Sequence, residues 1–316
     1  MHDFRVPASH GVGERHGETT CRGTQTGFVV DIDEELVRRL VAEQFPRWAH
    51  LPVAAVARQG WDNRTFRLGD HLVVRLPSAE GYVSGVAKED RWLPVLARHL
   101  PLPVPEPVAT GRPGAGYPYP WSVRRWLPGD TLGAAGEVDR SAVAGDLGAF
   151  LTALRRAPTV GGPAAGRHSC FRGCHPSAYG DEVEQALDAL GGRVDTATCQ
   201  DVWARALTSA WPAAPVWFHG DVAVGNLLVA EGRLSAVIDF GTCGVGDPAC
   251  DLVPAWTWFA GPERQLFREA VGLPDDAWRR ARGWALWKAL ITLAADDRNE
   301  EQSRTLAAVL TDPVVD

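Results

Sequence analysis

The chain has 316 residues, of which 45% are hydrophobic and 22% are charged. This is ordinary globular composition, and it excludes collagen, an extended coiled coil and a largely disordered polymer. A net charge of -7 also disfavours a nucleic acid as the main partner, because the phosphate backbone repels an acidic protein.

The N-terminal residues contain no signal-peptide core, and no apolar run approaches the length of a membrane span. These two features predict a cytoplasmic protein with no membrane partner. Six cysteines are spread along the chain, which favours free thiols over a disulfide framework. The sequence leaves the oligomeric state open between a monomer and a homodimer.

The first part of the chain combines a leader with a β-rich segment. Residues 1–26 lack hydrophobic periodicity, which predicts a flexible leader. Asp33 is placed to cap an amphipathic helix, and a second helical pattern over 83–99 is interrupted by Pro94. Runs rich in branched or aromatic residues predict strands at 53–58, 65–68, 72–76 and 119–127, and the proline-dense segment 101–111 predicts a loop and an edge-type strand. Residues 27–127 are therefore predicted to form a small antiparallel β-rich lobe.

Residues 128–316 show mainly helical periodicity, so a second, helical lobe is predicted there. One interruption consists of two short apolar strands, 227–229 and 234–240, joined by a turn at Glu231 and Gly232. Helices are predicted at 141–155, 182–190, 197–210, 251–259, 263–271 and 275–295. The fold class predicted from this order of elements is α+β.

The interruption carries the residues with the clearest chemistry. The segment WFHGDVAVGNLLVAEGRLSAVIDFG holds Asp221, Asn226 and Asp239 at loop positions beside apolar strands. A carboxylate and an amide oxygen can bind Mg²⁺ as hard ligands, while another carboxylate orients a hydroxyl group. That combination suits phosphoryl transfer, in which positioning and charge neutralisation do most of the catalysis. Taken singly, the two aspartates could equally be turn formers or helix caps.

HGDVAVGN followed by IDFG resembles the catalytic loop and metal-binding segment of the aminoglycoside phosphotransferase family, which belongs to the protein-kinase-like superfamily. In that superfamily an Asn follows the catalytic Asp by five residues, and the Asp of a DFG motif lies thirteen further on. The resemblance extends from Val53 to the C-terminus. It implies a bilobal protein-kinase-like fold, with Asp221 as catalytic base or hydroxyl orienter and with Asn226 and Asp239 as Mg²⁺ ligands.

The same resemblance implies two supporting residues and a nucleotide site. His219 is expected to organise the backbone of the loop, and Asp251, in GDPACDL, to brace it from a helix. The nucleotide site is expected to use Gly60 and Asn63 in a phosphate-covering loop, Arg75 held by Glu89 at the phosphates, the backbone of Arg124 and Trp126 at adenine, and Asp130 at the ribose.

Three positions depart from the pattern. Arg75 stands where most kinases use a phosphate-pairing Lys, although an Arg can also grip phosphate oxygens and stays charged. Ala223 stands where protein kinases carry a Lys, which argues against a protein kinase. Val224 stands where the family loop often carries a Pro.

The resemblance implies transfer of the γ-phosphate of ATP or GTP to a hydroxyl of a small molecule, with an aminoglycoside-like antibiotic as the favoured acceptor and antibiotic resistance as the consequence. Alternative acceptors are a macrolide or another hydroxylated antibiotic, choline, homoserine or a sugar. A pseudokinase that binds nucleotide without transfer is the alternative from another functional class.

Two further clusters stay outside this interpretation. HSCFRGCH places His168, Cys170, Cys174 and His175 at short spacings, which suggests zinc, but the spacing matches no common zinc finger and favours a loop with incidental thiols. An acidic group near the end of the chain either attracts a polycationic substrate or forms a solvated helix face. It consists of Asp296, Asp297, Glu300 and Glu301.

Overall fold

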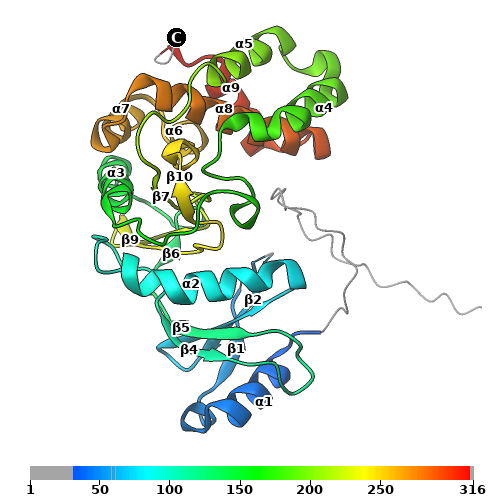
Figure 1. The fold of residues 1–316 in the computed structure, drawn as a ribbon, viewed down its shortest axis with the longest axis vertical. Coiled ribbons are helices and arrows are strands. Elements are labelled where there is room, and N and C mark those ends of the chain that lie inside the picture. Colours follow the sequence, from blue (N-terminus) through cyan, green and yellow to red (C-terminus); the bar gives the residue numbers. More distant parts are fainter. Residues whose placement is uncertain (1–30, 58, 61, 314–316) are drawn as a thin grey trace, which may run out of the picture.

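The computed structural model describes residues 31–57, 59–60 and 62–313. The leader predicted at 1–26, and Cys21 within it, lie outside the described residues. The described chain forms two lobes, a small one built on a β-sheet and a larger one built mainly of helices, with the long helix α2 between them (Figure 1). The predicted bilobal α+β architecture is confirmed.

The small lobe contains a five-stranded antiparallel sheet in the order β1-β2-β3-β5-β4. Edge strand β4 starts at a proline, which is tolerated there because its missing N–H breaks no bond inside the sheet. Gly69, with φ +60°, makes the tight turn between β2 and β3. The strands are β1 (Val53–Ala55), β2 (Asn63–Leu68), β3 (Leu72–Pro77), β4 (Pro107–Gly111) and β5 (Trp121–Arg125).

Helix α1 (Glu34–Gln44), followed by the 3-10 turn η1 (Pro46–Trp48), covers one face of this sheet (Figure 1). Asp33 caps α1 as predicted, because its carboxylate accepts the N–H of Leu36 at 2.7 Å. The apolar stripe of α1 packs on buried strand residues, and burial of each such side chain contributes about 1.5–3 kcal/mol. The stripe consists of Leu36, Val37, Leu40 and Val41.

Helix α2 (Val83–Leu96), preceded by η2 (Glu80–Tyr82), lies on the opposite face of the sheet. It continues through Pro94 as one helix, so this proline does not start a second helix. The C-terminal part of α2, through Trp92, Leu93 and Leu96, packs into the core of the large lobe. Helix α2 therefore lies against β4 and β5 of the small lobe and also contributes to the core of the large lobe.

The large lobe contains two small sheets next to the connection between the lobes. One has the order β6-β8-β9, and the other pairs β7 with β10. The predicted hairpin is β8–β9, and both Glu231 (φ 52°) and Gly232 (φ 75°) adopt the left-handed backbone that tight hairpin turns require. Strands β6 and β10 were not predicted. The strands are β6 (Asp130–Thr131), β7 (Val216–Phe218), β8 (Leu227–Ala230), β9 (Arg233–Val237) and β10 (Gly244–Gly246).

Helix α8 (Asp275–Ala295) lies inside the large lobe and is buried on most of its surface. The helix predicted at 251–259 is divided into η6 (Pro248–Leu252) and α6 (Pro254–Thr257), because Pro254 cannot donate a backbone hydrogen bond. Helix α9 (Glu300–Leu310) was missed. The remaining helices are α3 (Arg140–Arg156), α4 (Gly180–Leu190), α5 (Thr196–Ala206) and α7 (Gly261–Val271), with 3-10 turns η3 (Arg167–Ser169), η4 (Pro176–Tyr179) and η5 (Gly191–Arg193).

The described side chains form two buried hydrophobic clusters, one under α1 in the small lobe and a larger one that extends from α2 to α9. The domain boundary between residues 127 and 128 stays a prediction. Of the described helices, none combines the length and the apolarity that a membrane crossing requires.

Lys88 on α2 joins the two lobes directly. Its Nζ donates to the carbonyl oxygens of Cys243 at 3.0 Å and His168 at 3.2 Å, and it lies 3.2 Å from His168 Nδ1. Burial lowers the pKa of this ammonium group because the charged form loses its hydration. The carbonyl oxygens replace part of that hydration and hold α2 against the large lobe.

Candidate active site

The loop between β7 and β8 brings Asp221 and Asn226 into direct contact. Asn226 Nδ2 donates to Asp221 Oδ2 at 2.8 Å and to the carbonyl oxygen of Asp221 at 3.0 Å. The loop is closed by a bond from the N–H of Asn226 to the carbonyl oxygen of Ala223. These bonds orient the carboxylate of Asp221, and the other carboxylate oxygen, Oδ1, accepts no hydrogen bond from the described residues.

His219 is buried and organises the loop through both ring nitrogens. Nδ1 accepts the N–H of Asp221 at 3.1 Å, and Nε2 lies 3.0 Å from the carbonyl oxygen of Ile238. The pattern assigns the proton to Nε2, because Nδ1 acts as an acceptor. Both ring nitrogens are thus engaged, which suits a structural role for His219 and leaves it no free nitrogen for proton transfer.

Asp251 on η6 braces the same loop from the protein interior. Its two carboxylate oxygens accept the N–H groups of His219 and Gly220, each at 2.7 Å. The carboxylate is 2% exposed, and burial raises its pKa, while the two amide donors act in the opposite direction. Gly220 has φ +87°, and a Cβ at this position would lie 2.8 Å from Thr242 Oγ1. The tight path of the backbone therefore requires a glycine at position 220 and a buried acceptor such as the Asp251 carboxylate.

Replacing Asp251 with Asn is expected to lower the free energy of unfolding by about 2–4 kcal/mol, because an amide can offer only one acceptor oxygen to two buried N–H donors. Urea unfolding at pH 7 measures the change. Asp139→Asn is the matched control, because Asp139 also caps a backbone N–H (that of Ala142), but in an exposed position. Equal losses in the two variants would contradict the bracing role.

Asp239 follows β9 and is placed beside the loop by its neighbour, because the N–H of Ile238 donates to the carbonyl oxygen of Asn226 at 2.9 Å. Asp239 adopts φ +65°, an unusual backbone conformation for a residue with a side chain. Its carboxylate is 37% exposed, and Oδ1 accepts from Arg75 Nη2 at 3.0 Å. This ion pair joins β3 of the small lobe to the segment after β9 in the large lobe.

The donor atoms present fit a hard divalent cation. Asn226 Oδ1 and Asp239 Oδ2 are hard oxygens that accept no hydrogen bond from the described residues. Mg²⁺ in phosphate-transferring sites takes one or two protein oxygens and completes its shell with phosphate and water. In the described part of the chain, no group of three or more His, Cys, Asp or Glu side chains could hold a metal. One carboxylate and one amide suit a cation that is bound together with nucleotide phosphates.

Glu89 on α2 holds two arginines at once. Its Oε1 accepts from Arg75 Nη1 at 3.1 Å, and its Oε2 accepts from Arg124 Nη2 at 3.1 Å. Glu89 is 3% exposed, yet its pKa falls to about 2, because the charges of Arg124 and Arg75 outweigh the effect of burial. The same pairing with Glu89 and Asp239 raises the pKa of Arg75. Arg75 therefore stays charged at the junction of the lobes.

The depressed pKa of Glu89 predicts a loss of stability in acid. Its pKa in the unfolded chain is near 4.5 and its pKa in the folded protein is about 2, so its contribution is complete above pH 4.5 and disappears as the pH falls towards 2. The pKa difference corresponds to about 3 kcal/mol. Urea unfolding between pH 7 and pH 3 should therefore show a weaker pH dependence for Glu89→Gln than for the wild type. Glu80→Gln, an exposed control on η2, should follow the wild type, and identical profiles of all three proteins would contradict this prediction.

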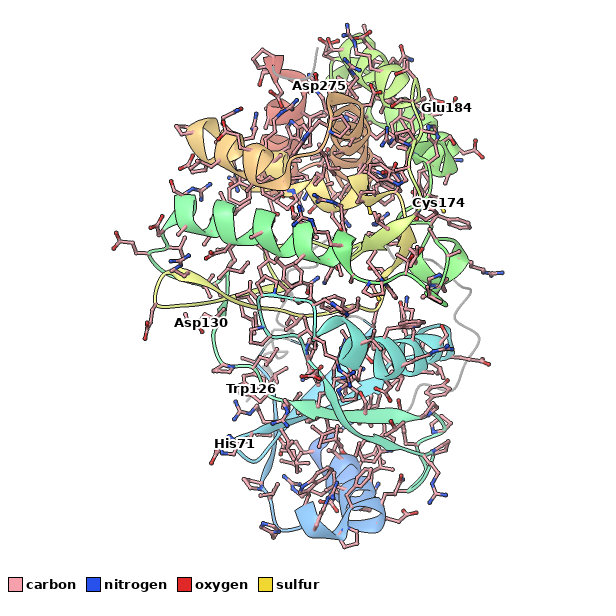
Figure 2. All side chains as sticks on the ribbon, turned by 60° about the vertical axis from the view of Figure 1, so that its left-hand side comes forward. His71, Trp126, Asp130, Cys174, Glu184 and Asp275 are labelled. Atoms are coloured by element: carbon pink, nitrogen blue, oxygen red, sulfur yellow. The ribbon has the colours of Figure 1, made fainter. Side chains whose placement is uncertain are left out.

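The residues predicted to contact adenine and ribose are Arg124, Trp126 and Asp130. Arg124 and Trp126 form contacts within the small lobe. Arg124 lies in β5 between β3 and β4, and its buried side chain pairs with Glu89 and Asp90. The backbone N–H of Trp126 donates to the carbonyl oxygen of His71. The Cζ atom of Arg67 lies 4.0 Å from the centre of the Trp126 ring. Figure 2 shows Trp126 and Asp130 on the side of the molecule where the chain passes from one lobe to the other.

Asp130 is exposed in β6, where it pairs with Val229. Gly60 lies in the loop before β2, its carbonyl oxygen accepts from Arg64 at 2.8 Å, and Asn63 is the first residue of β2. The nucleotide contacts assigned to Gly60, Asn63, Arg124, Trp126 and Asp130 stay predictions.

The residues of HSCFRGCH have structural partners. His168 contacts Lys88 and the carbonyl oxygen of Ala164, and His175 caps η4 by accepting the N–H of Ser177. Cys174 is a free thiol, as are Cys199, Cys243 and Cys250. Cys170 is engaged in a disulfide, so the prediction of free thiols was wrong for this residue.

The acidic residues near the end of the chain serve mostly as helix ends and surface pairs. Asp297 pairs with Arg193 at 2.7 Å, and Glu300 with Arg304 at 3.8 Å, both on the surface. Asp296 is the C-terminal cap of α8, and Glu300 and Glu301 open α9. These contacts favour the interpretation as a solvated helix face.

Sequence reasoning missed two residues that contact the site. Lys88 joins α2 to the segment after Asp239, and Arg172 donates to the carbonyl oxygen of Gly220 at 3.2 Å. Neither contact leaves a local signal, because the partners are separated by 155 and 48 residues in the chain.

The chain is similar to known phosphotransferases. Residues 53–284 match the model of the phosphotransferase enzyme family. An aminoglycoside 3'-phosphotransferase of Escherichia coli is 39% identical over 61 residues, which cover 19% of this chain and only 22% of that protein.

Solved structures show the same fold at low sequence identity. The GDP complex of wild-type aminoglycoside 2'-phosphotransferase-IIIa superposes with a TM-score of 0.64 at 17% identity, over 88% of this chain and 97% of that one. The macrolide 2'-phosphotransferase MphH of Brachybacterium faecium superposes with a TM-score of 0.56 at 22% identity, over 88% and 99% of the two chains. The fold is therefore the bilobal protein-kinase-like fold, and the chain belongs to the phosphotransferase enzyme family.

Proposed function

We propose that this protein transfers the γ-phosphate of ATP or GTP to a hydroxyl group of a small molecule. The observation that carries the proposal is the contact between Asp221 and Asn226 beside Asp239. Asp221 Oδ1, Asn226 Oδ1 and Asp239 Oδ2 each accept no hydrogen bond from the described residues. Phosphoryl transfer requires such an arrangement, in which one carboxylate receives a proton and other oxygens hold the metal and its phosphates.

Each residue of the cluster has a role in this proposal. Asp221 orients the acceptor hydroxyl and takes its proton through Oδ1, while Asn226 fixes the carboxylate through Oδ2. Asn226 and Asp239 hold Mg²⁺, which neutralises phosphate charge when bound. Arg75, held by Glu89, binds phosphate oxygens as a permanent cation. Arg75 must exchange its bond with Asp239 for phosphate as the nucleotide binds.

An aminoglycoside-like antibiotic is the proposed acceptor, and its modification would give resistance. Support comes from the E. coli relative and from solved structures of the same fold, among them the GDP and kanamycin complex of an aminoglycoside 2''-phosphotransferase. The fold similarity to a macrolide 2'-phosphotransferase supports macrolides as the second candidate class. Since ATP and GTP are cytoplasmic, we place the reaction in the cytoplasm.

Mass spectrometry of a mixed acceptor panel tests the proposal. The protein is incubated with Mg²⁺, either ATP or GTP, and a panel of aminoglycosides, macrolides, choline, homoserine and sugars. We expect one acceptor class to gain the mass of one phosphate, with equimolar loss of nucleotide triphosphate. Asp221→Asn, assayed in parallel, controls for contaminating kinases. No phosphorylated acceptor in any arm would contradict the proposal for these classes.

A pseudokinase remains the alternative functional class, because Arg75, Ala223 and Val224 depart from the kinase pattern. Thermal shift with ATP or GTP, with and without Mg²⁺, measures nucleotide binding independently of transfer. Stabilisation by nucleotide without any phosphorylated product would favour the pseudokinase.

A further inference from the structure

Arg172 reaches the catalytic loop from a segment that the proposed mechanism does not use. Its Nε donates to the carbonyl oxygen of Gly220 at 3.2 Å. This oxygen belongs to the peptide group that joins Gly220 to Asp221. Arg172 therefore contacts the backbone immediately before the carboxylate that receives the proton.

The guanidinium group is held in place by aromatic rings. Its Cζ lies 4.4 Å from the ring centre of Trp287, 5.3 Å from that of Trp284 and 5.7 Å from that of Tyr179. Aromatic faces attract a cation and restrict its side-chain rotamers. Among the residues that the structure describes, Arg172 forms no ion pair, and its Nη1 is buried without a hydrogen-bond partner. The group is thus a cation directed at a carbonyl oxygen and held by aromatic rings.

The backbone around Arg172 packs closely against β7, the strand that precedes the loop. Cys170 and Phe171 both adopt positive φ, at 49° and 53°. A Cβ on Gly173 would lie 2.0 Å from the ring of Phe218, and the carbonyl oxygen of Gly173 accepts the N–H of Asp247 at 2.8 Å. Since Phe218 ends β7, this close packing sets the distance from Arg172 to the loop.

Arg172 completes a set of side-chain bonds that hold the backbone before the catalytic carboxylate. Gly220, without a Cβ, does little to restrict the peptide group that follows it. The N–H of this peptide group donates to His219 Nδ1 and its carbonyl oxygen accepts from Arg172, while Asp251 accepts the N–H groups of His219 and Gly220. Loss of Arg172 would leave the peptide group before Asp221 held through its N–H alone.

We propose that Arg172 is a positioning residue for Asp221, acting through the carbonyl oxygen of Gly220. This inference rests on the proposed function of Asp221 and goes beyond it, because Arg172 contacts Gly220 and aromatic rings rather than the residues proposed to hold nucleotide or metal. Its removal lowers the rate of the transfer step and leaves nucleotide binding unchanged.

Two substitutions separate this role from general stability. Arg172→Met keeps apolar contact with Trp287 but removes the donor and the charge, and we expect kcat to fall about 10- to 100-fold with an unchanged KM for the nucleotide. Arg172→Lys keeps a charged donor and recovers most of the loss. Arg268→Met is the control, because Arg268 lies over Trp278 at 5.1 Å and pairs with Asp275, and its kcat stays within about twofold of wild type.

Hydrogen exchange supplies a readout that needs no activity. In Arg172→Met, amides of the peptide covering residues 219–223 should exchange faster than in the wild type, while amides of α1 keep their rates. Unchanged loop exchange, or unchanged kcat in Arg172→Met, would overturn the inference. If the wild type itself transfers no phosphate, the proposed function fails, and loop exchange alone then decides whether Arg172 holds the loop.

Discussion

Replacement of Asp221 with Asn is expected to lower kcat for phosphate transfer by about 10²- to 10⁴-fold, the usual contribution of a positioned general base. The amide keeps the size of the side chain and still accepts from Asn226, but it cannot take the proton of the acceptor hydroxyl. Because Asp221 is not proposed to bind phosphate or metal, the affinity for ATP or GTP should change little. Steady-state kinetics with the acceptor found in the panel measures the rate, and thermal shift measures nucleotide binding.

Asp201→Asn on α5 is the control for Asp221→Asn, because Asp201 is an exposed carboxylate that pairs with Arg205 four residues on. It should leave both the rate and the affinity unchanged. Full turnover by Asp221→Asn would remove the proton-accepting role. Equal loss of turnover and of nucleotide binding would instead assign Asp221 to the nucleotide.

The second large effect is expected for Asp239→Asn, which should lower kcat about 10²- to 10³-fold and weaken the Mg²⁺ dependence of nucleotide binding. The substitution removes the one charged oxygen ligand that the proposed metal site contains. It also deprives Arg75 of one of its two carboxylate partners, although Glu89 still holds the guanidinium group. The amide keeps the volume and tolerates the positive φ at this position.

A Mg²⁺ titration of the nucleotide-induced thermal shift separates metal binding from folding. The wild type should show a saturable increase of Tm with Mg²⁺ in the presence of nucleotide, and Asp239→Asn should require a higher Mg²⁺ concentration for the same increase. Tm without nucleotide shows the effect of losing the Arg75 pair. Titration curves that coincide would exclude Asp239 as a metal ligand.

The sequence alone allowed several local elements to be predicted. The cap at Asp33 and the turn at Glu231–Gly232 depend on residues close together in the chain, and both are found. The prediction of one helix over 251–259 was wrong because Pro254 divides this segment. The proline is a local signal, but the apolar periodicity of the segment was given more weight. Helix α9, which packs mainly against the neighbouring helix α8, was missed, and so was β10, a short strand whose pairing partner is β7.

Of the candidate site, the sequence indicated which residues lie at its centre. Asp221, Asn226 and Asp239 were found from residue types and two spacings, since one loop and one hairpin carry all three. The family resemblance also implied the pairing of Arg75 with Glu89 and the place of Asp251 behind the loop. Only the tertiary structure decided that Glu89 also pairs with Arg124, that Lys88 lies between the lobes and that Arg172 donates to Gly220, because these partners are far apart in the chain. A spacing pattern records only neighbours along the chain, whereas these charges meet because the folded backbone carries them to buried places where each must find a partner.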